Sequence, residues 1–194
     1  MARSAQARLT REDYEDGATA EFDAEPGLLN PGLQWLGSGI IEWVKAACFR
    51  GESYDTMDAE AAAIPPGCDG VTMVPDFLAS GDRKGSRAAM EALTWRLKSR
   101  LRRLESVGGF KSEFLILVGG GARNSVWTQM RADILRIPVK VSEVSESTVL
   151  GASMFAFAGA GVYSTPEQAR DAFGITYRTY MPGPQEAAYE KLNH

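Results

Sequence analysis

The stretch FLILVGGGARNSVWTQ, residues 114–129, constrains the fold of this chain more than any other. The apolar run FLILV is typical of a strand that is buried on both faces of a sheet. Three consecutive glycines follow it, and a backbone without Cβ atoms can approach a ligand closely. A helix beginning near Ser125 would present free amide groups at its N-terminus, which favour an anion or the polar edge of a ring. The stretch therefore predicts a strand, a ligand-binding turn and a helix, in that order.

Elements on both sides of this turn predict a layered α/β fold. Asn30-Pro31-Gly32 is typical of a helix start, with a side-chain acceptor for the first free amides. A leucine stripe at three- and four-residue steps predicts a long helix, and the small residues of segment 147–158 would let a helix lie close to a sheet. The predicted helices span 33–48, 50–63, 86–107, 125–135 and 147–158, with a last one from 165, and the predicted strands span 71–74, 114–118 and 139–141. This alternation of strands and helices is that of an α/β domain.

A length of 194 residues suits one domain with a sizeable core. We expect an irregular lead-in over residues 1–28, the domain itself over 29–180, and a polar tail over 181–194.

Composition excludes several classes of protein. A net charge of −4 argues against a general nucleic-acid binder, which needs a clustered positive excess. The two cysteines, Cys48 and Cys68, are too few and too far apart for a disulfide framework or a zinc site, which favours a reducing compartment. No apolar run is long enough to cross a bilayer, and the N-terminus has no signal-peptide pattern. We therefore expect a cytoplasmic protein with neither a nucleic acid nor a membrane as partner.

The one histidine, His194, is the last residue, where the chain cannot hold an imidazole in place. A Ser-His-Asp or Cys-His mechanism is therefore excluded, and so is a histidine-based metal site. We predict no catalytic residue and no metal site in this chain. Any chemistry depends on carboxylates, backbone amides or a bound nucleotide.

The glycine turn can be compared with the dinucleotide-binding fingerprint G-x-G-x-x-G. Gly119 and Gly121 match its first two glycines, whereas Asn124 stands where the third belongs. Glu143 lies at about the distance expected for a ribose-binding acid. Asn124 also occupies the natural N-cap position, so a capping role and a ligand role both stay open.

The stretch VGGGARNSVWTQMRADILRIPVKVSEVSESTVLGASMFAFAGAGVY resembles the carboxy-terminal domain of the FGGY carbohydrate kinases, and within that family its L-fuculokinase members. The resemblance continues upstream through GLLNPGLQWLGSGIIEWV and IPPGCDGVTM, and downstream through YSTPEQARDAFGITYRTYMPGP. It implies an actin-like ATPase (ribonuclease H-like) fold, in which the glycine turn is the adenosine motif. The nucleotide-binding residues that it implies are Gly119, Gly120, Gly121, Ala122, Arg123 and Asn124.

The resemblance also implies an activity, the ATP-dependent phosphorylation of a sugar hydroxyl, with Mg²⁺ held mainly through the ATP phosphates. Members of the family are more than twice this length. Their amino-terminal half supplies a phosphate loop, the sugar site and the catalytic aspartate. The segment from Asp76 to Ser86 is also too short for the hairpin that approaches the phosphates in the family.

We therefore expect a half that binds ATP or ADP and is inactive without an FGGY amino-terminal half, supplied in trans, or that forms a homodimer. A noncatalytic nucleotide-binding or oligomerisation module and a dinucleotide-binding domain are the alternatives.

Overall fold

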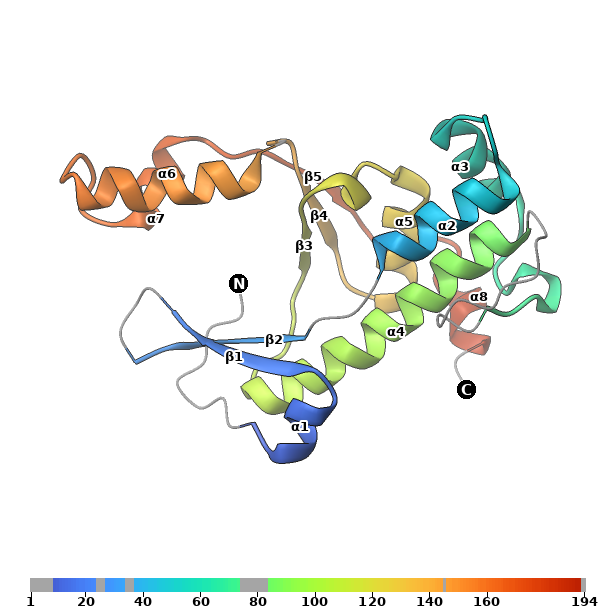
Figure 1. Ribbon diagram of the computed structural model, residues 1–194, viewed down its shortest axis with the longest axis horizontal. Coiled ribbons are helices and arrows are strands. Elements are labelled where there is room, and N and C mark those ends of the chain that lie inside the picture. The colour runs from blue at the N-terminus through green and yellow to red at the C-terminus, as the bar shows by residue number, and fades with distance from the viewer. Residues whose placement is uncertain (1–8, 24–26, 34–36, 74–83, 145, 193–194) are drawn as a thin grey trace.

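The long helix α4 (Lys84–Gly108) organises the fold, because helices and a hairpin pack along its whole length (Figure 1). The computed structural model describes residues 9–23, 27–33, 37–73, 84–144 and 146–192. The leucine stripe predicted this helix over 86–107, and the prediction is confirmed. α2 (Ser38–Cys48), α3 (Tyr54–Ala63), the 3₁₀ turn η1 (Cys68–Gly70) and α5 (Ser125–Leu135) all contact α4.

The apolar core lies between the first half of α4, the helices α2, α3 and α5, and the short C-terminal helix α8 (Glu186–Lys191). Its largest fully buried apolar side chains are those of Phe49, Ile40, Val44, Met57, Met90, Met130, Ile134 and Tyr189. Tyr189 lies in the segment for which the sequence predicted only a polar tail. The C-terminal segment is therefore part of the core.

A buried network of polar groups joins three segments that are far apart in the sequence. Arg87 on α4 donates from Nε to Glu91 Oε1 at 2.9 Å, from Nη1 to the Ala61 carbonyl at 3.0 Å and from Nη2 to Tyr189 Oη at 2.6 Å. The Tyr189 hydroxyl in turn donates to Glu91 Oε1 at 2.8 Å. The Gly67 amide donates to Glu91 Oε2 at 3.1 Å. The network thus connects α4 to the end of α3, to η1 and to α8.

A three-stranded sheet follows α4 and carries the glycine turn. β3 (Leu115–Leu117) pairs in parallel with β4 (Val139–Ser142), which pairs antiparallel with β5 (Tyr177–Tyr180). α5 connects β3 to β4 and contacts both β4 and β5. The predictions of two strands and of the helix between them are confirmed, whereas β5 was not predicted.

The predicted burial of both faces of the first strand is wrong. Phe114, Ile116 and Val118, which alternate along β3 and its ends, are 42%, 39% and 58% exposed. Within the described part of the chain, β3 pairs with β4 alone and is therefore an edge strand. The apolar run formed the expected strand but left one apolar face uncovered.

The N-terminal part forms a hairpin where the sequence predicted a helix start. β1 (Ala18–Phe22) pairs antiparallel with β2 (Leu29–Leu33), and Pro31 faces Ala20 in this ladder. The helix expected from Asn30-Pro31-Gly32 begins only at Ser38. A proline is tolerated here because both strands of a two-stranded hairpin are edge strands. Before the hairpin, α1 (Arg11–Glu15) is capped by the Thr10 side chain.

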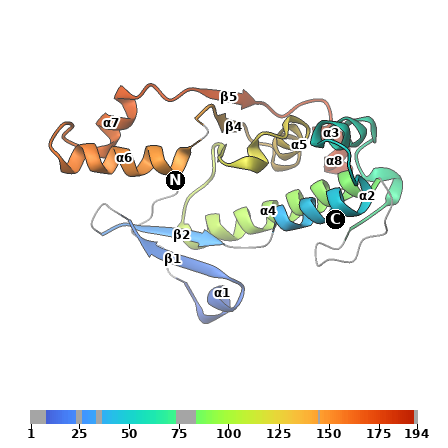
Figure 2. The same ribbon diagram turned by 45° about the horizontal axis from the view of Figure 1, so that its top comes forward.

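The helices α6 (Ser147–Gly159) and α7 (Pro166–Ala172) form an arm that projects away from the core in both views (Figures 1 and 2). The rings of Phe157, Tyr163 and Phe173 meet edge to face at 5.8–6.4 Å and hold the two helices together. No residue of α6 is buried. The small residues predicted a helix close to a sheet, but among the described elements α6 packs mainly against α7.

Two further predictions fall at the edge of the described residues. Residues 71–73 form no strand, and Val74 lies outside the description. Most of the segment from Asp76 to Ser86, which the sequence predicted to be a shortened loop, also lies outside it. Among the residues that the structure describes, no helix is both long enough and apolar enough to cross a membrane.

Replacing Arg87 tests the buried network. Arg87→Met leaves the Glu91 carboxylate buried without its cation, which we expect to cost about 3 kcal/mol or more of unfolding free energy. Tyr189→Phe keeps the ion pair and should cost about 1–2 kcal/mol. The measurement is urea unfolding, with Arg11→Met at an exposed ion pair as the control, expected within about 0.5 kcal/mol of the parent. Equal losses for Arg87→Met and Arg11→Met would contradict the network's role.

The two cysteines should react at very different rates. Cys68 is fully buried, and burial together with the nearby Glu91 carboxylate raises the pKa of its thiol to about 12. Cys48 is partly exposed. Because the thiolate is the reactive form, iodoacetamide at pH 8 should alkylate Cys48 and spare Cys68 until the protein unfolds. Mass spectrometry of the labelled peptides measures both rates, and equal labelling in the folded state would show that the core is open.

Candidate functional site

A pocket of about 500 Å³ lies where β3 and β4 end. Because the two strands are parallel, their carboxyl ends meet at the same edge of the sheet, which is where open α/β sheets bind ligands. One wall comes from the end of β3 and the glycine turn, and the other comes from the end of β4 and the start of α6. The lining residues are Val118, Gly119, Gly120, Ala122, Arg123, Val141, Ser142, Glu143, Val144, Glu146, Ser147 and Thr148.

The structure divides the six nucleotide-binding residues predicted from the sequence into two groups. Four of them line the pocket, namely Gly119, Gly120, Ala122 and Arg123. Gly121 and Asn124 are not part of its lining. The turn itself is the short 3₁₀ helix η2 (Gly120–Ala122).

Two of the glycines have distinct physical roles. Gly119 has a φ of +82°, a conformation that side chains with a Cβ rarely adopt. Gly120 has no such requirement, and a Cβ built on it would meet no atom within 4 Å. Gly120 therefore leaves open space on the pocket side. Its amide donates to no other described residue, so it is available to a ligand.

Asn124 is engaged on both sides of its carboxamide. Its Oδ1 accepts from the Trp127 amide at 2.8 Å, which caps α5. Its Nδ2 donates to Asp58 Oδ1 on α3 at 2.6 Å. Burial raises the pKa of Asp58, the neighbouring Asp55 adds to this, and the hydrogen bond from Asn124 opposes it. The geometry thus gives Asn124 a capping and docking role that engages both ends of its carboxamide.

Two side chains of α5, those of Arg131 and Trp127, hold the glycine turn in place. Arg131 donates from Nη1 to the Gly121 carbonyl at 3.1 Å, and its guanidinium carbon lies 3.7 Å from the centre of the Trp127 ring. Burial lowers the pKa of Arg131 to about 10, so it remains a cation at neutral pH. Trp127 Nε1 donates to Thr94 Oγ1 and to the Met90 carbonyl on α4, at 3.0 and 3.2 Å. The turn is thereby anchored to the long helix.

Sequence reasoning missed the second wall of the pocket as a binding surface. Glu143 was noticed as a possible ribose-binding acid, but Ser142, Ser147 and Thr148 were not. The Glu143 side chain is exposed and accepts from Thr176 Oγ1 at 2.5 Å. The signal was present in the sequence, because a strand that follows a strand–turn–helix unit in parallel must end beside the turn.

The pocket offers backbone donors, the apolar side chains of Val118, Val141 and Val144, one arginine and two carboxylates. Such a mixture suits the faces and edges of a planar ring and the hydroxyls of a sugar. Across the described residues, no group of three or more His, Cys, Asp and Glu side chains is placed to hold a metal ion.

Comparison with known proteins identifies the family that this chain resembles. Residues 85–160 match the C-terminal domain of the FGGY family of carbohydrate kinases. The chain is 43% identical to the L-fuculokinase of Salmonella typhi over 94% of its length, and 40% identical to that of Escherichia coli K12 over 99%. It spans 41% and 43% of those two proteins, which is about two fifths of their length.

Solved structures share the fold. The chain superposes on gluconate kinase from Lactobacillus acidophilus with a TM-score of 0.79 and 18% identity, covering 98% of this chain and 42% of that one. It superposes on Plasmodium falciparum glycerol kinase with ADP with a TM-score of 0.69 and 16% identity, covering 85% and 36%. The α/β fold is therefore the actin-like fold of the sugar kinases, as the sequence predicted. This chain carries the carboxy-terminal domain of the FGGY family of carbohydrate kinases and resembles the L-fuculokinases along nearly its whole length.

Proposed function

We propose that this chain is the nucleotide-binding half of a fuculokinase-type sugar kinase, which binds ATP and ADP in the pocket between β3 and β4. The observation that carries the proposal is the glycine turn, in which Gly120, with open space at its Cβ position, lines a pocket at the carboxyl ends of two parallel strands. The related glycerol kinase was solved with ADP, which supports the same class of ligand here.

In this proposal the base and the ribose occupy the pocket. The base lies against Gly120 and Ala122, with the apolar side chains of Val118 and Val141 nearby. The Glu143 carboxylate is placed to accept hydrogen bonds from ribose hydroxyls, as acidic residues do at other nucleotide sites. The phosphates extend out of the pocket and carry Mg²⁺ with them, so no protein ligand for the ion is required from this half.

Transfer of a phosphoryl group to a sugar hydroxyl requires more than these residues. It needs a base or an orienting group for the hydroxyl and several charges around the phosphates. Of the acids in the pocket, Glu143 is engaged by Thr176, and Glu146 is exposed at the start of α6. We propose that the missing groups come from an FGGY amino-terminal half and that this half alone does not phosphorylate sugars.

The exposed apolar surfaces support docking of such a half. Val149 and Phe155 on α6 are 62% and 49% exposed. The apolar face of β3 is a second exposed apolar surface. Monomeric proteins rarely expose apolar groups in contiguous patches unless they bind a partner there. A second copy of the chain is the other candidate for covering α6, and this would make the chain an oligomerisation module.

Calorimetric titration with ADP, Mg-ATP and NAD tests nucleotide binding. Gly120→Ala adds a methyl group on the pocket side without a clash in the free protein, and should weaken ADP binding about tenfold or more. Gly121→Ala is the matched control, because Gly121 does not line the pocket and a Cβ there makes only ordinary contacts. Asn124→Ala is a poorer probe, since loss of the cap alone costs about 1 kcal/mol of stability.

Equal affinity of the two alanine variants for ADP would contradict the pocket assignment. Tighter binding of NAD than of ADP would favour the dinucleotide-binding alternative. Absence of binding by all three nucleotides would leave the oligomerisation module as the better description.

Complementation tests whether this chain needs an amino-terminal half to phosphorylate a sugar. The chain should show no sugar-dependent release of ADP from ATP by itself, with L-fuculose among a panel of sugars. Adding the separately produced amino-terminal half of a related L-fuculokinase should restore activity, and Gly120→Ala should reduce it while Gly121→Ala should not. Activity of the isolated chain would contradict the proposal, and so would a complex that forms but stays inactive at saturating ATP.

A further inference from the structure

Glu143, which lines the pocket between β3 and β4, is held by two hydrogen bonds to a single residue. Its amide donates to the Thr176 carbonyl at 3.2 Å, which extends the antiparallel ladder of β4 and β5 one step beyond the pair of Ser142 and Tyr177. The Thr176 hydroxyl donates to Glu143 Oε2 at 2.5 Å. Thr176 lies in the connection between α7 and β5, and it thus fixes both the backbone and the side chain of Glu143.

One oxygen of the Glu143 carboxylate has no partner among the residues that the structure describes. Oε2 accepts from Thr176, whereas Oε1 accepts from no described group, and Glu143 pairs with no described cation. An ionised carboxylate can only accept hydrogen bonds, so the free oxygen favours a ligand group that donates one. Because its side chain is exposed on the wall of the pocket, Glu143 is a preorganised acceptor for a hydroxyl of a ligand.

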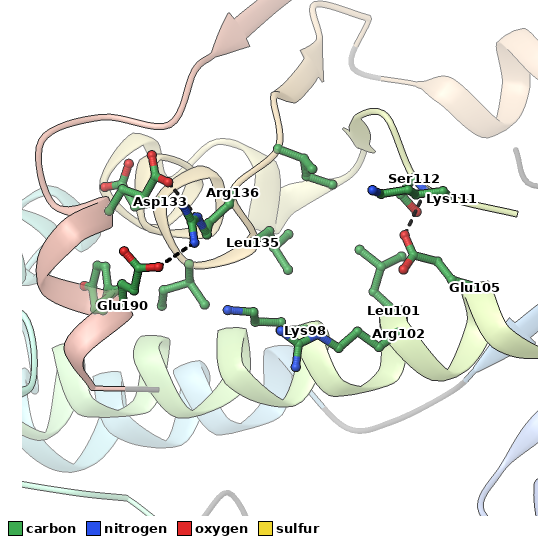
Figure 3. A pocket seen from close by; sticks show the side chains of 14 residues that line it. Lys98, Leu101, Arg102, Glu105, Lys111, Ser112, Asp133, Leu135, Arg136 and Glu190 are labelled. Atoms are coloured by element: carbon green, nitrogen blue, oxygen red, sulfur yellow. Dashed lines mark hydrogen bonds and ion pairs between the residues drawn. The ribbon is translucent and has the colours of Figure 1, made fainter. Parts of the chain in front are cut away.

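Two acids near the amino ends of the same strands provide a contrast. A pocket of about 220 Å³ lies there, between α4, the end of α5 and α8 (Figure 3). Its carboxylates Glu186 and Glu190 both accept from the Arg136 guanidinium, at 2.6 and 2.9 Å. Because a cation of the protein donates to each of them, these two acids are less available to a hydroxyl of a ligand than Glu143 is.

We propose that Glu143 makes the pocket selective for ribonucleotides over 2′-deoxyribonucleotides, with Thr176 as the positioning residue that orients its carboxylate. This inference rests on the proposed function, because it requires a nucleotide in the pocket. A ribose has two hydroxyls that donate to a carboxylate, and a 2′-deoxyribose has lost one of them. A site that is built around such a hydrogen bond rejects the analogue that lacks it, because the polar group of the protein is then left unpaired.

The charge of Glu143 also favours one orientation of the nucleotide. Like charges repel each other more strongly where water is partly excluded, so the phosphates lie away from this carboxylate. The hydroxyls of the sugar are uncharged donors and lie beside it. The end of β4 therefore suits the ribose, while Gly120 and Ala122 on the facing wall are left for the base.

Calorimetric titration of the chain with ADP and with 2′-deoxy-ADP tests the selection. The parent should bind ADP about tenfold more tightly than 2′-deoxy-ADP. Glu143→Ala should weaken the binding of ADP and bring the two affinities together. Glu146→Ala is the matched control, because it removes another exposed carboxylate from the lining of the same pocket and should keep the difference between the two nucleotides.

Two variants of Thr176 test the positioning role. Thr176→Val removes the hydroxyl at nearly constant shape and should reduce the preference for ADP, whereas Thr176→Ser keeps a hydroxyl and should restore it. The ratio of the two affinities is the decisive quantity. A merely structural role of Thr176 would change the binding of ADP and of 2′-deoxy-ADP by the same factor and leave this ratio unchanged.

Equal binding of ADP and 2′-deoxy-ADP by the parent would overturn the inference and leave the proposed function standing. A preference for ADP that survives Glu143→Ala would overturn it too, and an unchanged ratio in Thr176→Val would overturn the role of Thr176. If the parent bound neither nucleotide, the proposed function itself would fail, and this inference with it.

Discussion

The buried ion pair between Arg87 and Glu91 is the interaction on which the rest of this structure depends. A guanidinium and a carboxylate are expensive to remove from water, and they are stable in a core only when every remaining donor and acceptor finds a partner. Here those partners are the Ala61 carbonyl, the Gly67 amide and the Tyr189 hydroxyl. The polar requirement of one pair on α4 thus fixes the end of α3, the η1 turn and the C-terminal helix in one arrangement.

From this fixed helix, a chain of contacts leads to the glycine turn and the pocket that we propose for the nucleotide. Met90 and Thr94 on α4 accept from the Trp127 indole, the Trp127 ring supports Arg131, and Arg131 holds the Gly121 carbonyl. The protein's own side chains therefore hold the turn in place. At Gly120, which lines the pocket, the space where a Cβ would lie is open. A site preorganised in this way does not need to order its backbone when a ligand binds, which lowers the cost of binding.

The elements that the sequence predicted well are those whose pattern is local. The leucine stripe of α4 and the strand–turn–helix around the glycines were found because helical spacing and glycine runs are visible within a short window. The hairpin was missed because Asn30-Pro31-Gly32 has the composition of a helix start, and only the pairing of Pro31 with Ala20 decides otherwise. Tyr189 was missed because a single aromatic residue in a polar tail carries no period, and its burial depends on Arg87, which lies far away in the sequence.

For the candidate site the limit of prediction was similar. The glycine wall was predicted by position, and four of its six residues line the pocket. The second wall comes from β4 and α6, whose place beside the turn depends on strand order and not on any local motif. Asn124 shows the same limit, because its partner Asp58 is on a different helix. The exposed face of β3 could not be foreseen either, since an apolar run predicts a strand and not the number of its neighbours.

The central claim is that a nucleotide binds between the glycine turn and the end of β4, and a crystal structure of the chain grown with ADP tests it most directly. The account predicts that the base lies against Gly120 and Ala122 and the ribose near Glu143, with Asn124 still bonded to Asp58 and to the amide of Trp127. ADP bound elsewhere on the molecule would contradict the account. So would a structure in which Asn124 leaves Asp58 to bind the base.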